Sequence, residues 1–541
     1  MTQDMDRSDW PGWPDEAARR YRAVGHWQGT TFGEQLSGWA VRYAHRVALV
    51  DGDRRWTYAA LDTAVRRLMT GLIGLGLKRG DKVIVQLPNR AEFVLLWFAL
   101  TRLGIVPIHA MPAHRRNEIA HLTAMAEAVA YVIPDRHARF DYRELAARVR
   151  AEAGIRHVIV AGDPGGHDGF LAMADLLDNE PAPDPADPPQ AGDLALLLLS
   201  GGTTGMPKLV PRTHDDFAYN SRRAAELCEL TEDSVYLAVL PIAFNYTMSC
   251  PGMLGVLQAG GRVVLAPSPG ARTAFDLIER EGVTIAAINP PLVPHWLAEF
   301  EQGDTDLSSL RVLQVGSARL ADDLAAAVTK TFACRLQQVF GMAEGLLCLT
   351  RLDDPDELVH TTQGRPISAD DEVRVVGPDD VEVAPGETGE LLTRGPYTLR
   401  GYFRAAEHNA RAFTADGFYR TGDLVQQLPT GHLNVVGRAK DQINRGGQKI
   451  DATEVEGHLL ACPGVLSAAL LPEADTVLGE RSVAFLVCSG EPPSTSTLQT
   501  FFRDRGVAAY KVPDRVAVVD ELPSTAVGKI DKKALARRYL G

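Results

Sequence analysis

Residues 194–208 read LALLLLSGGTTGMPK, an unbroken apolar run followed by a loop of small residues that ends in lysine. The apolar run has the length and composition of a fully buried strand. The glycines that follow let backbone amides approach an anion closely, and Ser200, Thr203 and Thr204 add hydroxyl donors. The loop does not have the G-x-x-x-x-G-K-[ST] order of P-loop NTPases. We therefore predict a phosphate-binding loop of another kind, with an ordinary flexible turn as the alternative.

Elsewhere, short apolar runs alternate with stretches of helical spacing. Lys82–Leu87 and Arg262–Leu265 predict buried strands, and Ala91–Leu103 and Ala321–Phe332 predict helices. This alternation predicts an α/β fold of stacked layers. With 541 residues the chain is too long for one compact core, so we expect at least two domains.

Composition and charge exclude several classes of function. The formal net charge is −13 and basic residues form no long run, so we expect no nucleic-acid partner. The longest apolar runs are far shorter than the roughly 20 residues that span a bilayer, and the acidic first nine residues do not resemble a secretory signal. We expect a soluble, cytoplasmic protein with no membrane partner. Six scattered cysteines without a C-x-x-C pair predict reduced thiols: Cys228, Cys250, Cys334, Cys348, Cys462 and Cys488.

Five further motifs follow the loop in a fixed order. They are VGSARL (315–320), VFGMAE (339–344), GFYRTGDL (417–424), GRAKDQINRGGQKI (437–450) and LPSTAVGKIDKKAL (522–535). Together with SGGTTGMPK, they resemble the adenylate-forming superfamily of acyl- and aryl-CoA synthetases, luciferases and peptide-synthetase adenylation domains. The resemblance covers nearly the whole chain. It implies a large N-terminal α/β domain of sheet-containing subdomains, residues 1–436, and a small mobile α+β domain, residues 437–541.

Charged residues within these motifs suit nucleotide chemistry. A carboxylate at Glu344 suits Mg²⁺, which prefers oxygen ligands, and the resemblance makes it the metal-associated residue. The ammonium of Lys529 stands on a flexible stem that could enter a closed cleft and neutralise an α-phosphate, which makes it the candidate catalytic lysine. By resemblance, Asp423 accepts hydrogen bonds from both ribose hydroxyls, with Arg438 beside it. Taken singly, these residues also fit a solvated acid, a surface lysine and a turn.

The resemblance also assigns the remaining nucleotide contacts and a hinge. Small residues let a flat purine lie against the backbone, and Phe340 replaces the tyrosine of many relatives, so an apolar wall for adenine is implied. Lys440 occupies the hinge position, and Lys449 is implied to face the site after the small domain rotates. The full nucleotide set is Ser200, Gly201, Gly202, Thr203, Thr204, Lys208, Gly316, Ser317, Ala318, Val339, Phe340, Gly341, Met342, Asp423, Val435 and Arg438.

Within the superfamily, the chain is most similar to the aryl-acid adenylating enzymes of siderophore assembly, the 2,3-dihydroxybenzoate-AMP and salicyl-AMP ligases. The resemblance rests on four segments: RYRAVGHWQGTTF (20–32), PRTHDDFAYN (211–220), AFNYTMSCPG (243–252) and FGMAEGLLCLTRLDD (340–354). The implied acid-binding residues are Asn245 at the ortho-hydroxyl, Tyr246 as a ring wall, Cys250, Leu347 and His214. A structural histidine is an equally good interpretation of His214.

Cys250 stands where dihydroxybenzoate enzymes typically carry serine. A thiol is a weak hydrogen-bond donor and behaves as a small hydrophobe, so a second ring hydroxyl would lack a partner. An unpartnered buried hydroxyl costs about 1 to 3 kcal/mol. Salicylate is therefore favoured over 2,3-dihydroxybenzoate as a hypothesis.

The implied reaction joins the aryl acid to AMP from ATP, with Mg²⁺ bound to the phosphates. Pyrophosphate leaves, and the acyl group then passes to a pantetheinyl thiol. About a dozen residues follow Lys529, so we expect this thiol on a separate carrier protein. An aryl-CoA ligase that uses free coenzyme A is the alternative, and a non-catalytic nucleotide-binding module is the alternative of a different class.

Overall fold

The computed structural model describes residues 9–200, 207–438, 441–445, 448–475, 478–505, 507, 509–525 and 528–540. Gly201 to Thr204 and Lys440, which were predicted to lie in the phosphate loop and the hinge, fall outside these ranges. For Lys449 the backbone is described and the side chain is not.

A seven-stranded, mostly parallel sheet forms the first layer of the N-terminal half. The predicted strands 194–199 and 82–87 both lie in it. Its strands, in spatial order, are β11 (Leu209–Thr213), β10 (Leu194–Leu199), β4 (Val106–His109), β3 (Lys82–Val85), β5 (Ala130–Pro134), β8 (His157–Ala161) and β9 (Phe170–Ala172). A separate two-stranded ribbon of β6 (Arg136–His137) and β7 (Phe140–Asp141) follows β5 in the sequence.

A nine-stranded sheet forms the second layer, with parallel strands at its centre. Its strands, in spatial order, are β18 (Arg365–Pro366), β17 (Gly345–Leu349), β16 (Arg335–Met342), β15 (Val312–Gly316), β14 (Ile285–Ile288), β12 (Val235–Ala238), β13 (Arg262–Leu265), β1 (Val47–Asp51) and β2 (Arg54–Thr57). The predicted strand 262–265 is confirmed as β13.

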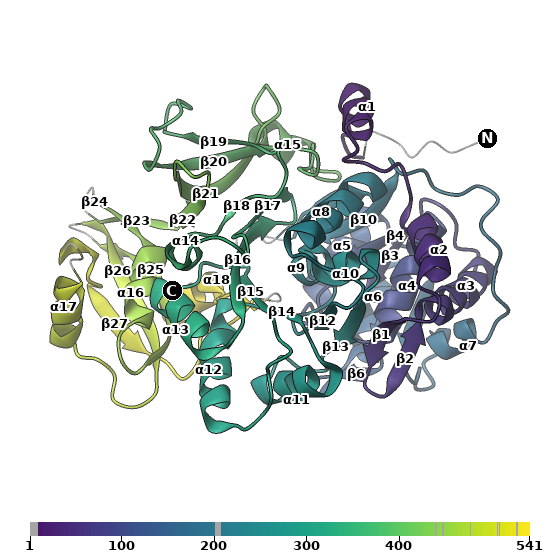
Figure 1. The fold of residues 1–541 in the computed structure, drawn as a ribbon, viewed down its shortest axis with the longest axis horizontal. Coiled ribbons are helices and arrows are strands. Elements are labelled where there is room, and N and C mark those ends of the chain that lie inside the picture. The colour runs from purple at the N-terminus through teal and green to yellow at the C-terminus, as the bar shows by residue number, and fades with distance from the viewer. Residues whose placement is uncertain are drawn as a thin grey trace.

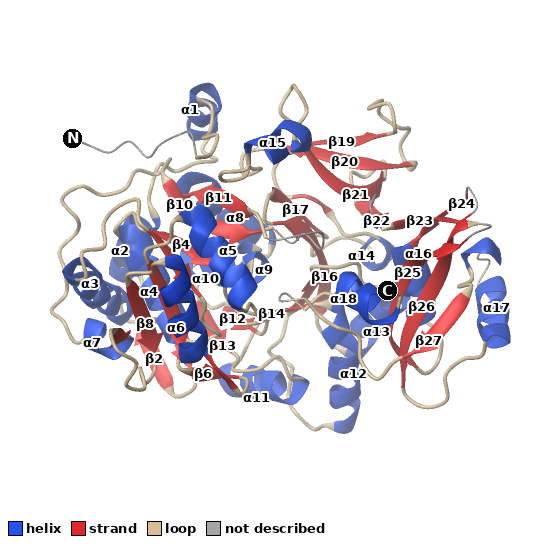
Figure 2. Cartoon of the chain, turned by 180° about the vertical axis from the view of Figure 1, so that it is seen from behind, coloured by secondary structure: helices blue, strands red, loops and turns tan. Residues whose placement is uncertain are grey.

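Helices fill the space between these sheets and cover their outer faces (Figure 2). Every residue of α4 (Ala91–Arg102) except Glu92 is buried, so the predicted helix 91–103 is confirmed as a core helix between the layers. The outer face of the nine-stranded sheet packs on α11, α12 and α13, and the predicted helix 321–332 is α13. The helices of this half are α1 (Asp15–Ala23), α2 (Phe32–Arg42), α3 (Tyr58–Gly74), α4 (Ala91–Arg102), α5 (Arg116–Ala126), α6 (Tyr142–Ala153), α7 (Met173–Leu177), α8 (His214–Leu227), α9 (Asn245–Ser249), α10 (Gly252–Gln258), α11 (Ala271–Glu281), α12 (Val293–Gln302), α13 (Asp322–Thr331) and α14 (Asp356–Thr361).

Two smaller sheets complete the molecule (Figure 1). An antiparallel sheet contains β19 (Glu372–Val376), β20 (Thr388–Arg394), β21 (Tyr419–Gln427) and β22 (Leu433–Arg438), with α15 (Ala406–Ala412) beside it. The C-terminal sheet contains β24 (Gln448–Asp451), β23 (Gln442–Arg445), β26 (Gly479–Cys488), β25 (Val465–Asp475) and β27 (Arg515–Val518). Its helices are α16 (Ala452–Leu460), α17 (Thr495–Asp504) and α18 (Lys532–Tyr539), and separate small cores lie on its two faces. The predicted α/β architecture, large N-terminal part and smaller α+β C-terminal part, is confirmed.

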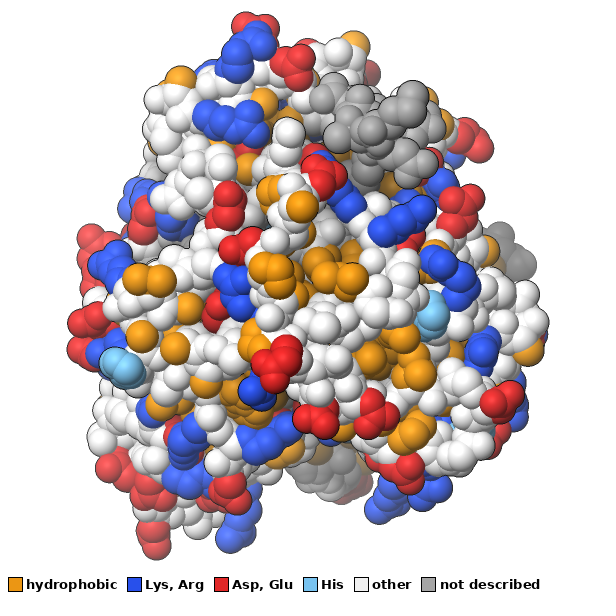
Figure 3. All heavy atoms as spheres, turned by 90° about the vertical axis from the view of Figure 1, so that its right-hand side faces the viewer, with side chains coloured by type: hydrophobic (Ala, Val, Ile, Leu, Met, Phe, Trp, Pro, Cys, Tyr) orange, Lys and Arg blue, Asp and Glu red, His pale blue; other side chains and the backbone are white. Residues whose placement is uncertain are grey.

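The surface carries both signs of charge. On the face shown in Figure 3, acidic and basic side chains are interspersed among small groups of hydrophobic ones, so the negative net charge is not gathered there into one patch. Within the described ranges, no helix combines the length and the apolar character that crossing a bilayer requires.

Gly364, directly before β18, allows a test of how the nine-stranded sheet packs. Its φ is +81°, and a Cβ added there would overlap the Leu349 carbonyl carbon and the Thr350 nitrogen. Gly364→Ala must therefore displace β17 and also hold a left-handed backbone. We expect the free energy of unfolding, measured by chemical denaturation, to fall by about 2 to 4 kcal/mol.

Gly386→Ala is the matched control. Gly386 has a φ of +87°, but nothing lies within 4 Å of an added Cβ, so this variant meets no backbone overlap. We expect it to lose only about 1 to 2 kcal/mol through the left-handed backbone. Equal losses in the two variants would contradict the close packing of Gly364 on β17.

Candidate active site

Four charged side chains from three sheets meet where the C-terminal sheet faces the N-terminal half. Glu344 lies in the turn between β16 and β17, Asp423 on β21 and Arg438 on β22. Asp423 and Arg438 are paired in register, and the Arg438 Nε donates to the Asp423 Oδ1 over 2.7 Å. Lys529 comes from the loop between β27 and α18. The sequence-predicted metal, ribose and catalytic residues are thus brought to one place.

The electrostatics confirm that these groups act on one another. Burial, together with the positive charge of Arg438, lowers the pKa of the Lys529 ammonium to about 8, against the opposing effect of Asp423 and Glu344. Burial raises the pKa of Asp423, against the lowering effect of Arg438 and Lys529. The pKa of Glu344 is also raised by burial. The cleft therefore holds two cations and two carboxylates at interacting distances.

The loop that contains Lys529 contacts the carboxyl end of β14, a parallel strand inside the nine-stranded sheet. Asn289, which directly follows β14, donates from its Nδ2 to the Gly528 carbonyl over 3.4 Å. The Thr525 nitrogen donates to the Lys529 carbonyl over 2.6 Å, and the Lys529 nitrogen donates to the Thr525 Oγ1 over 3.1 Å. An ion pair of 3.0 Å between Arg505 and Asp323 links α17 to α13. The C-terminal sheet thus delivers its lysine to the carboxyl ends of parallel strands, where α/β sheets bind ligands.

Two tyrosines that sequence reasoning missed hold the carboxylate of Glu344. The Tyr402 hydroxyl donates to the Glu344 Oε1 over 2.8 Å, and the Tyr419 hydroxyl lies 2.8 Å from that of Tyr402. The Lys208 Nζ lies 5.3 Å from the centre of the Tyr402 ring. Tyr419 belongs to the quoted motif GFYRTGDL, so its position was a usable signal. Tyr402 is 58 positions from Glu344 in the chain, so no local sequence pattern predicted their contact.

The ends of the predicted phosphate loop lie side by side. The Ser200 nitrogen donates to the Lys208 carbonyl over 2.9 Å, and the Lys208 nitrogen donates to the Ser200 Oγ over 3.1 Å. This pairing brings both ends of the loop to the side of the cleft where Tyr402 and Glu344 lie. The intervening residues, 201–206, are outside the described part of the chain.

The predicted adenine and acid residues form adjoining walls. Gly316 ends β15, and a Cβ added to it would lie 3.1 Å from the Tyr246 Cζ, so the tyrosine ring packs directly on this backbone. Ser317 has a φ of +71°, and Ala318 is exposed to the cleft. Val339, Phe340, Gly341 and Met342 end β16; Phe340, Met342 and Val435 pack on one small core, while Val339 is buried on the other side.

The predicted acid-binding residues surround the short helix α9. The Asn245 Nδ2 lies 4.0 Å from the Cys250 Sγ, at the far end of that helix. Burial raises the pKa of the Cys250 thiol to about 12, so it is neutral and uncharged near neutral pH. Leu347, on β17, packs against Gly341, where an added Cβ would lie 2.9 Å from its Cδ1.

His214 lies apart from this group. Its ring is completely buried, the Nδ1 accepts the Phe32 backbone N–H over 3.2 Å, and the two rings lie 5.2 Å apart. Burial lowers its pKa to about 3, so the imidazole is neutral. This environment favours the structural interpretation of His214 over a contact with a ligand. The motif around it forms the end of β11 and the start of α8, where Thr213 and Asp216 make a capping box.

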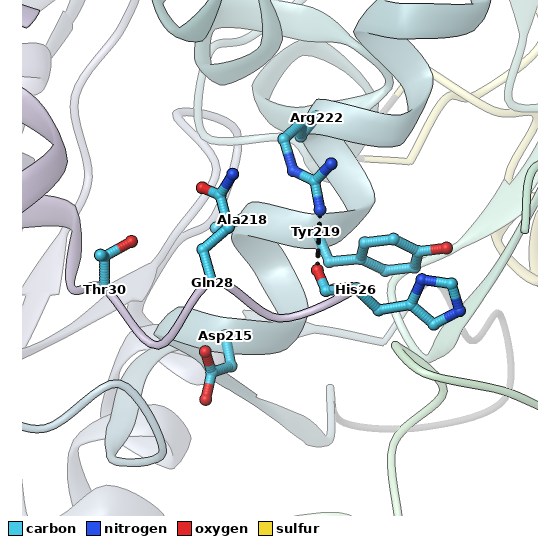
Figure 4. A pocket seen from close by; sticks show the side chains of 7 residues that line it. All are labelled: His26, Gln28, Thr30, Asp215, Ala218, Tyr219 and Arg222. Carbon is cyan, nitrogen blue, oxygen red and sulfur yellow. Dashed lines mark hydrogen bonds between the residues drawn. The ribbon is translucent and has the colours of Figure 1, made fainter. Parts of the chain in front are cut away.

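The N-terminal motif 20–32 packs on the same helix. Figure 4 shows a small cavity between residues 26–30 and α8, lined by side chains of both. Arg222 crosses it to donate to the His26 carbonyl over 2.8 Å. The predicted site residues do not line this cavity. The motif therefore serves to fix α8 against the body of the protein.

Comparison with known proteins gives the same architecture. The family model described as "AMP-binding enzyme" matches residues 36–403, and "AMP-binding enzyme C-terminal domain" matches residues 454–529. The chain is 52% identical over 524 residues to the 2,3-dihydroxybenzoate-AMP ligase of Bacillus subtilis, covering 97% of this chain and 96% of that protein. It is 49% identical over 544 residues to the salicylyl-CoA synthase / salicylate adenylyltransferase of a Streptomyces species, covering 98% of each. The apo structure of Mycobacterium smegmatis MbtA is similar with a TM-score of 0.76 and 44% identity, over 98% of this chain and 99% of that one.

The lowered pKa of Lys529 can be measured directly. We expect its ammonium, followed by NMR of the 13C-methylated protein, to titrate near pH 8. Arg438→Met removes a neighbouring positive charge and leaves Asp423 without its ion-pair partner, so the pKa of Lys529 should rise toward its ordinary value of 10.5.

Arg445→Met is the control for this titration, because Arg445 pairs with Asp514 within the C-terminal sheet. It should leave the midpoint of Lys529 unchanged. A midpoint that stays fixed in Arg438→Met would show that Lys529 and Arg438 do not share a cleft.

Proposed function

The chain belongs to the AMP-binding enzyme family, and from this membership and the geometry of its cleft we propose that it activates an aryl carboxylic acid with ATP. The products of this first step are the aryl adenylate and pyrophosphate. The acyl group then passes to a pantetheinyl thiol. Relatives that carry names of aryl-acid ligases, at about half identical residues over nearly the full chain, support the assignment.

The position of Lys529 is the observation that carries the proposal. It is a lysine of the C-terminal part, yet its charge interacts with Asp423 and Arg438 of the antiparallel sheet and with Glu344 beside the nine-stranded sheet. Near neutral pH most of this ammonium is protonated, so it carries the charge that a phosphate under attack requires. A surface lysine would have neither these neighbours nor this desolvation.

The remaining residues give the nucleotide a place along the cleft. Asp423, with Arg438 bonded to it, is suited to accept the two ribose hydroxyls, and the backbone at 316–318 is suited to the flat face of adenine. The hydroxyls and amides of 200–208 are suited to the β- and γ-phosphates.

Glu344 fits a magnesium ion that arrives with the nucleotide. Its buried carboxylate supplies hard oxygen ligands, and Tyr402 occupies one of its two oxygens. Among the described residues, no group of three or more His, Cys, Asp or Glu side chains could hold a metal by itself. Mg²⁺ commonly binds through one or two carboxylates together with substrate phosphates and water. Bound in this way, the ion would screen phosphate charge.

In the first step, a carboxylate oxygen of the acid attacks the α-phosphorus of ATP. The bond to the bridging oxygen breaks and pyrophosphate leaves, while Lys529 neutralises charge on the α-phosphate and the attacking oxygen. Alignment and charge neutralisation supply the acceleration, so the protein needs no covalent nucleophile and Ser200 is not one. In the second step, a thiol attacks the acyl carbonyl of the mixed anhydride and AMP leaves.

We propose salicylate as the preferred acid. The neutral, buried thiol of Cys250 lies beside Asn245, where it offers a second ring hydroxyl only a weak partner. Leu347 and Phe244 add apolar surface to the same region. Because the Bacillus relative carries the name of a 2,3-dihydroxybenzoate ligase, that acid is the direct competitor.

We propose a carrier protein as the thiol donor, with residues 437–541 rotating about Lys440 between the two steps. The Streptomyces relative carries the name of a CoA synthase, which keeps free coenzyme A as the second candidate. Supplying salicylate, ATP and coenzyme A, and assaying for a thioester, separates the two. A non-catalytic module is disfavoured because Glu344, Asp423, Arg438 and Lys529 are all present and assembled.

Lys529→Ala tests the proposed activity. We expect salicylate-dependent ATP–pyrophosphate exchange to fall by about 10²- to 10³-fold, because the charge at the α-phosphate loses its partner. Lys533→Ala, on the exposed side of α18, is the matched control and should retain exchange. Unchanged exchange in Lys529→Ala would remove the lysine from the mechanism, and no exchange with any aryl acid in the unaltered protein would overturn the function.

Cys250→Ser tests the choice of acid. A serine hydroxyl at this position offers a hydrogen bond to a second ring hydroxyl, worth about 1 kcal/mol. The ratio of kcat/KM for salicylate to that for 2,3-dihydroxybenzoate should exceed one in the unaltered protein and fall about fivefold in the variant. A ratio below one in the unaltered protein, or a ratio that the substitution leaves unchanged, would show that Cys250 does not determine which ring substituents are accepted.

A further inference from the structure

A buried relay of three side chains fixes the amide of Asn245. The Asn220 Nδ2, on α8, donates to the Ser249 backbone carbonyl over 2.9 Å and to the Ser249 Oγ over 3.1 Å. The Ser249 Oγ in turn lies 3.0 Å from the Asn245 Oδ1 and 3.2 Å from the Asn245 carbonyl. Asn220 is 2% exposed and Ser249 is completely buried, whereas Asn245 is only partly buried. The relay therefore runs from the core to the cleft.

The direction of each hydrogen bond follows from what the groups are able to donate. A carbonyl oxygen only accepts, so the atom of Asn220 that faces the Ser249 carbonyl must be its NH₂ group. The same group then donates to the Ser249 Oγ. A serine hydroxyl has a single hydrogen, and the acceptors within reach of it are the Asn245 Oδ1 at 3.0 Å, the Asn245 carbonyl at 3.2 Å and the weakly accepting Cys250 Sγ at 3.8 Å, so the bond to Oδ1 is the shortest. Ser249 is therefore the donor and Asn245 the acceptor.

This direction decides which end of the Asn245 amide is left for a ligand. Its Oδ1 is turned toward Ser249, so its NH₂ group is turned the other way. There the Nδ2 lies 4.0 Å from the Cys250 Sγ, a weak acceptor at the limit of contact. The Cys250 thiol itself lies 3.8 Å from the Asn245 carbonyl, to which it donates. Asn245 thus presents N–H to the cleft.

The helix that starts the relay is anchored from outside. Arg222 donates to the carbonyls of Gly25 and His26, and the Gly29 nitrogen donates to the Asp215 Oδ1 over 3.1 Å. These contacts lie on either side of Asn220 along α8, around the cavity in Figure 4. Asn220 is therefore held from a helix that cannot rotate freely, and its direction is imposed on Asn245.

We propose that Ser249 and Asn220 are positioning residues that make the pocket select aryl acids whose ortho substituent accepts a hydrogen bond over those whose ortho substituent only donates. The inference rests on the proposed function and deepens it. In salicylate, the hydroxyl hydrogen is given to the acid's own carboxylate, and the hydroxyl oxygen is free to accept from Asn245. In anthranilate, the nitrogen lone pair is delocalised into the ring, so N–H would meet N–H and both would lose partners.

The first experiment compares salicylate with anthranilate in ATP–pyrophosphate exchange by the unaltered protein. We expect kcat/KM to favour salicylate by about ten- to a hundredfold, the range for a buried polar group left unpaired. Equal values, or a preference for anthranilate, would overturn the inference and leave aryl-acid activation standing. No exchange with either acid or with 2,3-dihydroxybenzoate would overturn the proposed function, and this inference with it.

The second experiment removes the relay without touching the acid. In Ser249→Ala the Asn245 amide loses the donor that fixes it, and a flip then lets its oxygen meet the anthranilate amino group. The salicylate-to-anthranilate ratio should fall by about tenfold, while the KM for ATP stays unchanged. A general loss of structure would instead lower kcat/KM for both acids and also change the KM for ATP.

Ser221→Ala is the matched control for this variant. Ser221 is equally buried and adjoins Asn220 on α8, but its hydroxyl bonds the Phe217 and Ala218 carbonyls. It should leave the acid ratio unchanged, with both variants checked by thermal unfolding. An equal fall in the two variants, or an unchanged ratio in a folded Ser249→Ala, would overturn the inference.

Asn245→Asp provides an independent test should Ser249→Ala fold poorly. A carboxylate only accepts, so it replaces the donor that salicylate requires by an acceptor for the anthranilate amino group. Total activity should fall because a second negative charge lies near the substrate carboxylate. The ratio of the two acids should nevertheless move toward anthranilate by at least about tenfold, and a ratio that stays with salicylate would contradict the assigned direction of the relay.

Discussion

The arrangement of the molecule depends on placing Lys529 of the C-terminal sheet next to Arg438 of the antiparallel sheet. Burial lowers the pKa of Lys529, and the like charge of Arg438 adds to this shift. Asp423 and Glu344 offset part of the repulsion, but burial raises the pKa of both carboxyls as well. A polyphosphate entering the cleft would bring negative charge to where positive charge is concentrated. Under the proposed function, this concentration of positive charge favours nucleotide binding.

The contacts that hold the C-terminal sheet in this position are few and polar among the described residues. An exposed ion pair such as Arg505–Asp323 is worth at most about 1 kcal/mol, and the Asn289–Gly528 hydrogen bond is long at 3.4 Å. Neither is a hydrophobic seal of the kind that makes two domains one body. These two contacts would therefore oppose the proposed rotation between the two steps only weakly.

The charged residues of the site could be predicted from the sequence because each stands in a motif that resembles those of the superfamily. Asp423 and Arg438 lie 15 positions apart on paired strands, so their ion pair was within reach of a local pattern. Tyr402 could not be found in this way, because its bond to Glu344 joins a loop of the antiparallel sheet to a turn of the nine-stranded one. His214 carried a motif but no information on burial, and the packing of Phe32 from 182 positions away decided its environment. The relay from Asn220 to Ser249 likewise depends on how α8 and α9 pack.

The walls of the nucleotide and acid sites are not separate structures. The Tyr246 ring packs on the backbone of Gly316, so the residues proposed for the adenine wall and for the aryl-acid wall are in direct contact. Tyr246 also follows Asn245 directly in α9, and that helix is tied to the core through Ser249. A shift of α9 to accommodate a larger ring would therefore press on Gly316 and, behind it, on the Val339 carbonyl. Under the proposed function, selection of the acid and alignment of the nucleotide are for this reason one packing problem, because Tyr246 and Gly316 belong to both walls.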